Sequence, residues 1–358
     1  MEKNMKRNSW KKITGIITAG VMALSLCACG STDAGKENAS QENTDENTQE
    51  AGADSESKDL KEITFVLDWT PNTNHTGLYV AQNLGYFEEA GLDVTIVQPP
   101  EDGATTMVAS GQAQFGIDFQ DYLVPVFTSE EQMPVEAVAA LIQHNTSGII
   151  SLKEDGIESP ADMMGKNYAT WDLPIEHAIL KNVIETDGGD FEQVNLIPEY
   201  VTDVPTALQQ DIDAVWVYYA WDGVSTELAG LDTNFFYFKD LNPIFDYYSP
   251  VIIANTDFLN EDGDTARAFL DAVRKGYEYA IENPEEAADI LCEEVPELNP
   301  EMVKASQLWL TDQYKAEVEQ WGYIDPQRWD AFYAWLYENG LADEIPAGTG
   351  FTNDYLSK

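Results

Sequence analysis

The chain has 358 residues, 44% of them hydrophobic, which is enough for two folded lobes of ordinary domain size. Its 64 acidic residues greatly outnumber its 19 lysines and arginines, so the formal net charge is −45 at pH 7. Because the phosphates of nucleic acid attract basic proteins and repel acidic ones, this composition excludes nucleic acid as a partner.

The first thirty residues have the order of a bacterial secretion signal. Five basic residues precede an apolar run over residues 13–26, which is too short to span a bilayer. The run leads into a sequence like a bacterial lipobox, in which the small Ala28 directly precedes Cys29, whereas Cys27 follows a bulky leucine. We predict that residues 1–29 are a lipoprotein signal peptide with its lipobox and that Cys29 carries the lipid. A plain secretory signal is the alternative.

The next segment has the composition of a disordered linker. Residues 31–59 contain no large apolar side chain, and they carry nine acidic residues against two lysines. Such a segment cannot form a core and is extended by its own charge repulsion. We therefore predict a disordered acidic tether over residues 30–60, between the lipid anchor and the folded lobes.

Residues 63–92 predict a strand, a polar turn and a helix in succession. Residues 63–67 are alternating, β-branched and aromatic, as in a buried strand. The turn over 70–74 cannot continue a sheet because its proline lacks an N–H, and Gly91 can end the helix that follows. Ligands of open α/β sheets bind at the carboxyl ends of strands, so we expect residues 68–75 to line a site.

Three later strands are expected to end in a similar way. The strand over 115–118 ends at Asp118, the strand over 165–170 ends before Trp171, and the strand over 213–217 ends before Tyr218. Further strands are predicted over 93–97, 135–142, 148–152, 235–238 and 251–254, and helices over 105–110, 203–210, 266–283, 284–294, 300–309 and 327–339. This order predicts an α/β fold of two lobes joined by a hinge of two crossovers. We assign residues 61–152 and 246–358, with the C-terminal helices, to lobe I and residues 153–245 to lobe II.

The predicted strand ends combine aromatic rings with carboxylates. Aromatic faces bind a planar ring by stacking, worth about 0.5–1.5 kcal/mol beyond burial, and carboxylates accept hydrogen bonds from ring amines. For each aromatic the alternative is ordinary packing, which the strand-end position makes less favoured for Trp69, Trp171 and Trp221. The candidate ligand-binding residues are Asp68, Trp69, Asn74, His75, Asp118, Tyr122, Trp171, Glu176, Tyr218, Trp221 and Tyr248.

The remaining reactive residues do not indicate a metal or cofactor. The three histidines are far apart in sequence, and none is paired with another at helical spacing, so we expect no metal site and no cofactor. We expect His75 to donate a hydrogen bond to the ligand or its own loop, with a structural role as the alternative. Cys292 lies on an apolar helix face and is expected to be structural. No arginine is near the predicted site, which favours a neutral or weakly cationic ligand.

The stretch DWTPNTNHTGLYVAQNLGYFEEAGLDV resembles the start of the NMT1/THI5-like family, and the resemblance continues through GQAQFGID, GKNYATWDLPIEHAIL, IDAVWVYYAWDG and VIIANTDFL, over residues 61–295. The resemblance implies a type II periplasmic-binding-protein fold. It implies a monomeric solute receptor of an ABC importer, lipid-anchored outside the cytoplasm of a bacterial cell and working with permease subunits. The implied ligand is a thiamine-type pyrimidine, such as formylaminopyrimidine or hydroxymethylpyrimidine, with riboflavin as second choice.

The same family includes an enzyme, the fungal thiamine-pyrimidine synthase, which consumes pyridoxal phosphate and a histidine with iron. The resemblance puts Asp118 in place of its pyridoxal-bearing lysine and Tyr122 in place of its reactive histidine. Residues 244–248 contain no cysteine where its iron motif should fall. We therefore expect no enzyme activity, and the missing basic groups disfavour a sulfonate or nitrate receptor.

Overall fold

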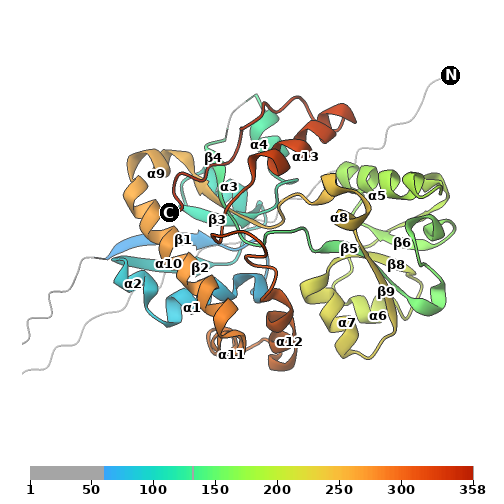
Figure 1. Ribbon diagram of the computed structural model, residues 1–358, viewed down its shortest axis with the longest axis horizontal. Helices are drawn as coiled ribbons and strands as arrows, with labels where there is room; N and C mark the ends of the chain where they lie inside the picture. Colours follow the sequence, from blue (N-terminus) through green and yellow to red (C-terminus); the bar gives the residue numbers. More distant parts are fainter. Residues whose placement is uncertain (1–59, 131–132, 358) are drawn as a thin grey trace, which may run out of the picture. The chain divides into compact units, whose positions relative to one another are not determined.

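The computed structural model describes residues 60–130 and 133–357 (Figure 1). The predicted signal peptide, Cys29 and all but the last residue of the predicted tether lie outside these ranges. Within the described residues, no helix has the length and hydropathy needed to cross a membrane.

The first lobe is built on a five-stranded sheet. Its strands run in the order β2-β1-β3-β10-β4, in which β10 is antiparallel to both of its neighbours and the other pairs are parallel. Their bounds are β1 (Lys61–Val66), β2 (Leu92–Val97), β3 (Phe115–Asp118), β4 (Val135–Ala140) and β10 (Val251–Asn255). Because β10 comes late in the chain, it returns to the first sheet after the chain has built the second one.

The second lobe has a sheet of the same size, in the order β7-β6-β8-β5-β9. Its strands are β5 (Ser147–Leu152), β6 (Asn167–Thr170), β7 (Asn195–Pro198), β8 (Ala214–Tyr218) and β9 (Thr233–Tyr237). We assigned residues 147–152 to the first lobe from the sequence, but β5 pairs along its length with β8 and β9. We therefore place the first crossover between β4 and β5 and the second between β9 and β10.

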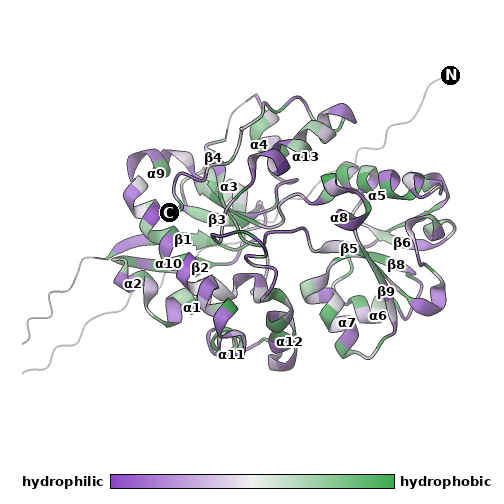
Figure 2. Cartoon of the chain, viewed as in Figure 1, coloured by the Kyte–Doolittle hydropathy of each residue, from purple (hydrophilic) through white to green (hydrophobic). Residues whose placement is uncertain are grey.

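Helices cover both sheets, and they carry both hydrophobic and hydrophilic residues (Figure 2). Those of the first lobe are α1 (Thr76–Asn83), α2 (Tyr86–Glu89), α3 (Gly103–Ala109), α4 (Val124–Thr128), α9 (Thr256–Glu261), α10 (Gly263–Glu282), α11 (Pro284–Glu294), α12 (Pro300–Leu310) and α13 (Pro326–Glu338). Those of the second lobe are α5 (Pro174–Thr186), α6 (Val204–Ala207), α7 (Val224–Leu228) and α8 (Phe238–Leu241). The long C-terminal helices begin within a few residues of their predicted starts because asparagine and aspartate side chains cap them.

The core of the first lobe holds helix α10 against the sheet. Phe269 of α10 stacks on Phe115 of β3 at 4.2 Å between ring centroids and on Phe87 of α2 at 5.5 Å. Helices α1 and α10 pack so closely that a Cβ at Gly276 would lie 1.9 Å from the backbone oxygen of Gly77. A glycine is required there, and this close contact fixes the start of α1, next to the predicted site.

Hydrogen bonds tie the two crossovers to one another. The backbone N–H of Asn145, in the first crossover, donates to Asp246 Oδ1 in the second at 3.0 Å. The Asn145 side-chain amide donates to the backbone oxygen of Phe245 at 2.9 Å. The two connecting segments are therefore hydrogen-bonded to each other and form one hinge.

Candidate functional site

The first part of the candidate site is the turn between β1 and α1. His75 is fully buried, and its Nε2 lies 2.7 Å from Asp68 Oδ1. The backbone N–H of Asn72 donates to His75 Nδ1 at 3.1 Å, so in the neutral ring the proton is on Nε2 and is donated to Asp68. His75 therefore donates within its own loop, one of the two roles expected of it, and orients Asp68; both of its ring nitrogens are already hydrogen-bonded.

Long-range hydrogen bonds hold this turn in place. The Tyr277 hydroxyl donates to the backbone oxygen of Asn74 at 2.6 Å, and the Tyr314 hydroxyl donates to that of Thr73 at 2.6 Å. Trp69, on the same turn, is 42% exposed. The turn thus presents an indole ring to solvent from a fixed backbone, as a contact for a flat ligand requires.

The second part follows β3. Asp118 accepts hydrogen bonds from the backbone N–H of Phe119 at 2.8 Å and from the Thr105 hydroxyl. Burial raises the pKa of Asp118 to about 6, and the charge of Asp68 adds to the rise, while the two hydrogen bonds oppose it. Tyr122 is 49% exposed and lies edge-on to Phe119 at 5.5 Å. Asp118 has both oxygens bonded within the protein, whereas Tyr122 is available to a ligand.

The third part, in the second lobe, is the turn after β6, where Glu176 is buried inside the protein. It accepts hydrogen bonds from the Tyr168 hydroxyl at 2.6 Å, the Thr170 hydroxyl at 3.0 Å and the backbone N–H groups of Trp171 and Leu173 at 3.2 Å. We predicted Glu176 as an acceptor for ligand amines. The structure instead uses it to fix the turn that carries the half-buried Trp171, whose ring lies 5.7 Å from that of Trp216.

Tyr218, at the end of β8, brings the two lobes together. Its ring stacks on Phe119 of the first lobe at 5.8 Å and 26°, and its hydroxyl accepts a hydrogen bond from Ser249 at 3.2 Å. Burial, followed by the charge of Asp121, raises the pKa of Tyr218 well above its usual value. The chain segments at the ends of β3 and β8 therefore lie against each other.

Two predicted site residues pack elsewhere. Trp221 packs against the hydrophobic cluster of Tyr79, Leu291 and Val303. Tyr248 is fully buried; its hydroxyl accepts from the backbone N–H of Asp325 at 2.8 Å, and the Arg328 guanidinium lies 4.8 Å from its ring centre. The burial of Tyr248 corrects its assignment to the site, because distant residues that the sequence does not reveal surround its ring. Trp221 is only partly buried, and its contact with the ligand stays a prediction.

One residue beside the site was not among the candidates. Asp121 follows Asp118 by three residues, and its Oδ1 is buried without a hydrogen-bond partner. Burial raises the pKa of Asp121 to about 7, and the charge of Asp118 adds to the rise, while hydrogen bonds from the backbone N–H groups of Asp121 and Tyr122 oppose it. A second carboxylate just past a strand end was the signal available in the sequence.

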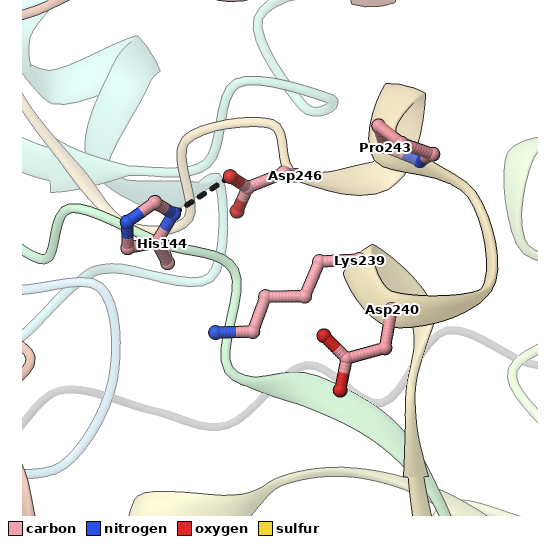
Figure 3. A pocket seen from close by; sticks show the side chains of 5 residues that line it. All are labelled: His144, Lys239, Asp240, Pro243 and Asp246. Atoms are coloured by element: carbon pink, nitrogen blue, oxygen red, sulfur yellow. Dashed lines mark hydrogen bonds and ion pairs between the residues drawn. The ribbon is translucent and has the colours of Figure 1, made fainter.

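The structure also has a hollow of about 290 Å³ at the hinge, lined by His144, Lys239, Asp240, Pro243 and Asp246 (Figure 3). None of these five residues belongs to the strand-end set, so we place the candidate site at the strand ends. Over residues 60–130 and 133–357, no cluster of three or more histidine, cysteine, aspartate or glutamate side chains is arranged to hold a metal ion.

The two mixed sheets, the late return of β10 and the paired crossovers define a two-lobed periplasmic-binding-protein fold. It is similar to that of the ligand-binding component of an ABC-type import system from Staphylococcus aureus, with a TM-score of 0.62 and 15% identity, covering 82% of this chain and 96% of that one. The chain belongs to the NMT1/THI5-like family, whose profile matches residues 72–287.

Two members of the family show its range. The chain is 31% identical to the formylaminopyrimidine-binding protein of Halalkalibacterium halodurans, over 79% of this chain and 86% of that protein. It is 23% identical to the 4-amino-5-hydroxymethyl-2-methylpyrimidine phosphate synthase THI11 of Saccharomyces cerevisiae, over 82% of this chain and 88% of that protein. The family therefore includes both binding proteins and enzymes.

Proposed function

We propose that this chain is the solute-binding component of an ABC importer and that it binds a thiamine-type pyrimidine, formylaminopyrimidine or hydroxymethylpyrimidine, outside the cytoplasm. The observation that carries the proposal is the 31% identity, over most of both chains, to a formylaminopyrimidine-binding protein. The site agrees in chemistry, because the aromatic rings of Trp69, Tyr122 and Trp171 accompany the carboxylates of Asp68 and Asp121 at the strand ends.

A binding role fits the described residues better than the synthase reaction does. Asp118 stands where the resemblance places the synthase's lysine, and a carboxylate cannot form a Schiff base with pyridoxal phosphate. Its hydrogen bonds to Thr105 and to the backbone N–H of Phe119 also hold it within the protein. We therefore infer that the chain binds and delivers its ligand unchanged, as a monomer that docks on permease subunits.

The proposal is tested with a soluble form of the protein that begins at residue 30. Ligand binding to the folded state raises the free energy of unfolding by about 2.7 kcal/mol when the free ligand is at 100 times Kd. We expect formylaminopyrimidine and 4-amino-5-hydroxymethyl-2-methylpyrimidine to raise Tm in thermal-shift measurements and to give saturable heats in calorimetry. Riboflavin and an alkanesulfonate are the comparison ligands, and a Tm rise with one of them but with neither pyrimidine would refute the assignment.

A further inference from the structure

Three unpaired polar atoms lie on elements that meet at Tyr218. In the described residues, five buried side-chain nitrogen or oxygen atoms lack a hydrogen-bond partner, and three of them are Asp121 Oδ1, Ser147 Oγ and Trp216 Nε1. Ser147 is fully buried, and Trp216 is only 5% exposed. Buried polar groups are nearly always paired because an unpaired one destabilises the fold. Several at one place indicate a binding partner that the folded chain alone does not supply.

The strand pairing places the two atoms of the second lobe on one face. Ser147, the first residue of β5, is directly opposite Tyr218 of β8. Trp216 precedes Tyr218 by two residues, so the side chains of all three residues point to the same side of the sheet. Ser147 and Trp216 therefore flank the ring that contacts the first lobe.

Asp121 approaches the same ring from the first lobe. Its charge is the largest electrostatic influence on the pKa of Tyr218 after burial, and it also raises the pKa values of Tyr122, Tyr247 and Tyr333. Phe119, two residues before Asp121, stacks on Tyr218. An acceptor from one lobe and two donors from the other thus border one ring.

The turn that carries Asp121 is fixed by its neighbour Gln120. The Gln120 side chain accepts from the backbone N–H of Tyr248 at 2.8 Å and donates to the backbone oxygen of Trp329 at 2.9 Å. The Tyr333 hydroxyl donates to the Gln120 backbone oxygen at 2.8 Å. A rigid turn that leaves one oxygen of its carboxylate without a hydrogen-bond partner has the form of a preorganised binding group.

We propose that Asp121, Ser147 and Trp216 form a polar subsite that recognises the amino edge of the ligand ring. Asp121 accepts an N–H of the exocyclic amine, and the hydroxyl of Ser147 or the indole N–H of Trp216 donates to the adjacent ring nitrogen. A 4-aminopyrimidine offers this donor and this acceptor side by side. The inference rests on the proposed function and names the residues that would select its ligand.

The variant Asp121→Asn tests the subsite by two opposite effects. It keeps the size of the side chain but removes a buried charge, so Tm of the ligand-free protein at pH 8 is expected to rise above that of the wild type. The Kd for formylaminopyrimidine is expected to rise about tenfold or more, because a hydrogen bond to a charged acceptor is lost. The matched control is Asp93→Asn, which removes an exposed carboxylate on β2 and should change neither quantity.

The variant Ser147→Ala tests the half of the subsite in the second lobe. It removes a hydroxyl that has no partner in the ligand-free protein, so Tm should be retained while Kd rises. A pyrimidine with a 4-oxo group reverses the donor and the acceptor, so it should bind the wild type more weakly than the amine. Asp121→Asn can also donate, so it should discriminate less between the two rings.

A loss of Tm in Asp121→Asn would show that the carboxylate is structural, and an unchanged Kd would remove it from the site. Either result overturns the subsite. Failure of the wild type to bind either pyrimidine would instead refute the proposed function. Wild-type binding with unaffected variants overturns only the subsite, so the two failures are distinguishable.

Discussion

The carboxylates of the candidate site differ in what their oxygen atoms contact. Glu176 accepts four hydrogen bonds and fixes a turn, Asp68 is held by His75, and Asp121 has an oxygen with no partner. Because a paired buried carboxylate stabilises the fold while an unpaired one destabilises it, chemically similar side chains have opposite consequences here. Residue type alone identifies candidates, and the contacts decide their roles.

Trp69 and Trp171 give a prediction that separates ligand contact from packing. Each precedes a helix at a strand end, and we predict that the two rings contact or sandwich one planar ring of the ligand. Loss of a stacking partner should cost on the order of 1–3 kcal/mol, roughly 5- to 150-fold in Kd, in either alanine variant. Trp69→Ala should leave Tm unchanged because the ring is 42% exposed, whereas Trp171→Ala should also lower Tm because that ring packs near Trp216.

Calorimetric titration with formylaminopyrimidine and melting curves of both variants provide the measurement. Leu228→Ala, a change of an exposed apolar residue in α7, is the control for lost apolar surface. Unchanged Kd in both tryptophan variants would remove the rings from the site. Equal losses of affinity and of Tm in both would assign them to packing.

At the scale of elements, local patterns predicted more than long-range pairing did. Strand β3 and helix α11 have their predicted bounds, because alternation and capping residues are local signals. A strand was predicted over 148–152, within one residue of β5, but its sheet was not, because a strand's partners are distant in sequence. The positions of Asp68, Tyr122 and Trp171 in turns could be predicted, because each comes soon after a strand that the sequence reveals. The packing of Trp221 and Tyr248 could not, because it depends on residues near the C-terminus that are distant in sequence.

The hinge contains a charged histidine that gives a prediction for pH dependence. His144 Nδ1 lies 2.7 Å from Asp246, and its Nε2 lies 2.8 Å from Glu317. Ionised carboxylates only accept hydrogen bonds, so both ring nitrogens must donate and the ring must carry a positive charge. The hydrogen bond with Asp246 is the main cause that raises the pKa of His144; the Glu317 bond adds to the rise, whereas burial and Arg328 oppose it.

A histidine pKa that is higher in the folded than in the unfolded state stabilises the fold fully below the unfolded value of about 6.5. This contribution is lost as pH rises through the folded-state pKa. We expect the free energy of unfolding of the wild type, relative to His144→Gln, to be greater at pH 5.5 than at pH 9. Urea unfolding over this range measures the difference.

The difference in free energy of unfolding between the wild type and His144→Gln isolates the contribution of the histidine. Asp118 and Asp121 also lower the free energy of unfolding as pH rises, because burial raises their pKa values. Their effect is the same in both proteins and cancels in the difference. Lys153→Gln, which removes a cation of an exposed ion pair at the end of β5 that is farther from the hinge, controls for net charge. Parallel pH profiles for wild type and His144→Gln would contradict the charged bridge between the crossovers.

At the scale of the whole molecule, the strong negative charge bears on the prediction that a lipid holds the chain at the membrane. A chain with a formal charge of −45 is repelled by anionic lipid headgroups, so electrostatics cannot retain it there. A receptor that delivers ligand to a permease has to stay close to the membrane. This makes the lipid predicted on Cys29 the expected means of retention.

We predict that Cys29→Ser, expressed in a bacterium with a lipoprotein pathway, releases the protein from the membrane because the acceptor thiol is lost. Cys27→Ser is the matched control: its serine lies two residues before the predicted attachment point and should be removed with the signal, so this variant should remain bound. Cell fractionation after a high-salt wash, with mass spectrometry of the mature N-terminus, provides the measurement. Continued attachment of Cys29→Ser, or release of Cys27→Ser, would refute the assignment. The result does not depend on the proposed ligand, because the predicted anchor and the candidate site are separate parts of the sequence.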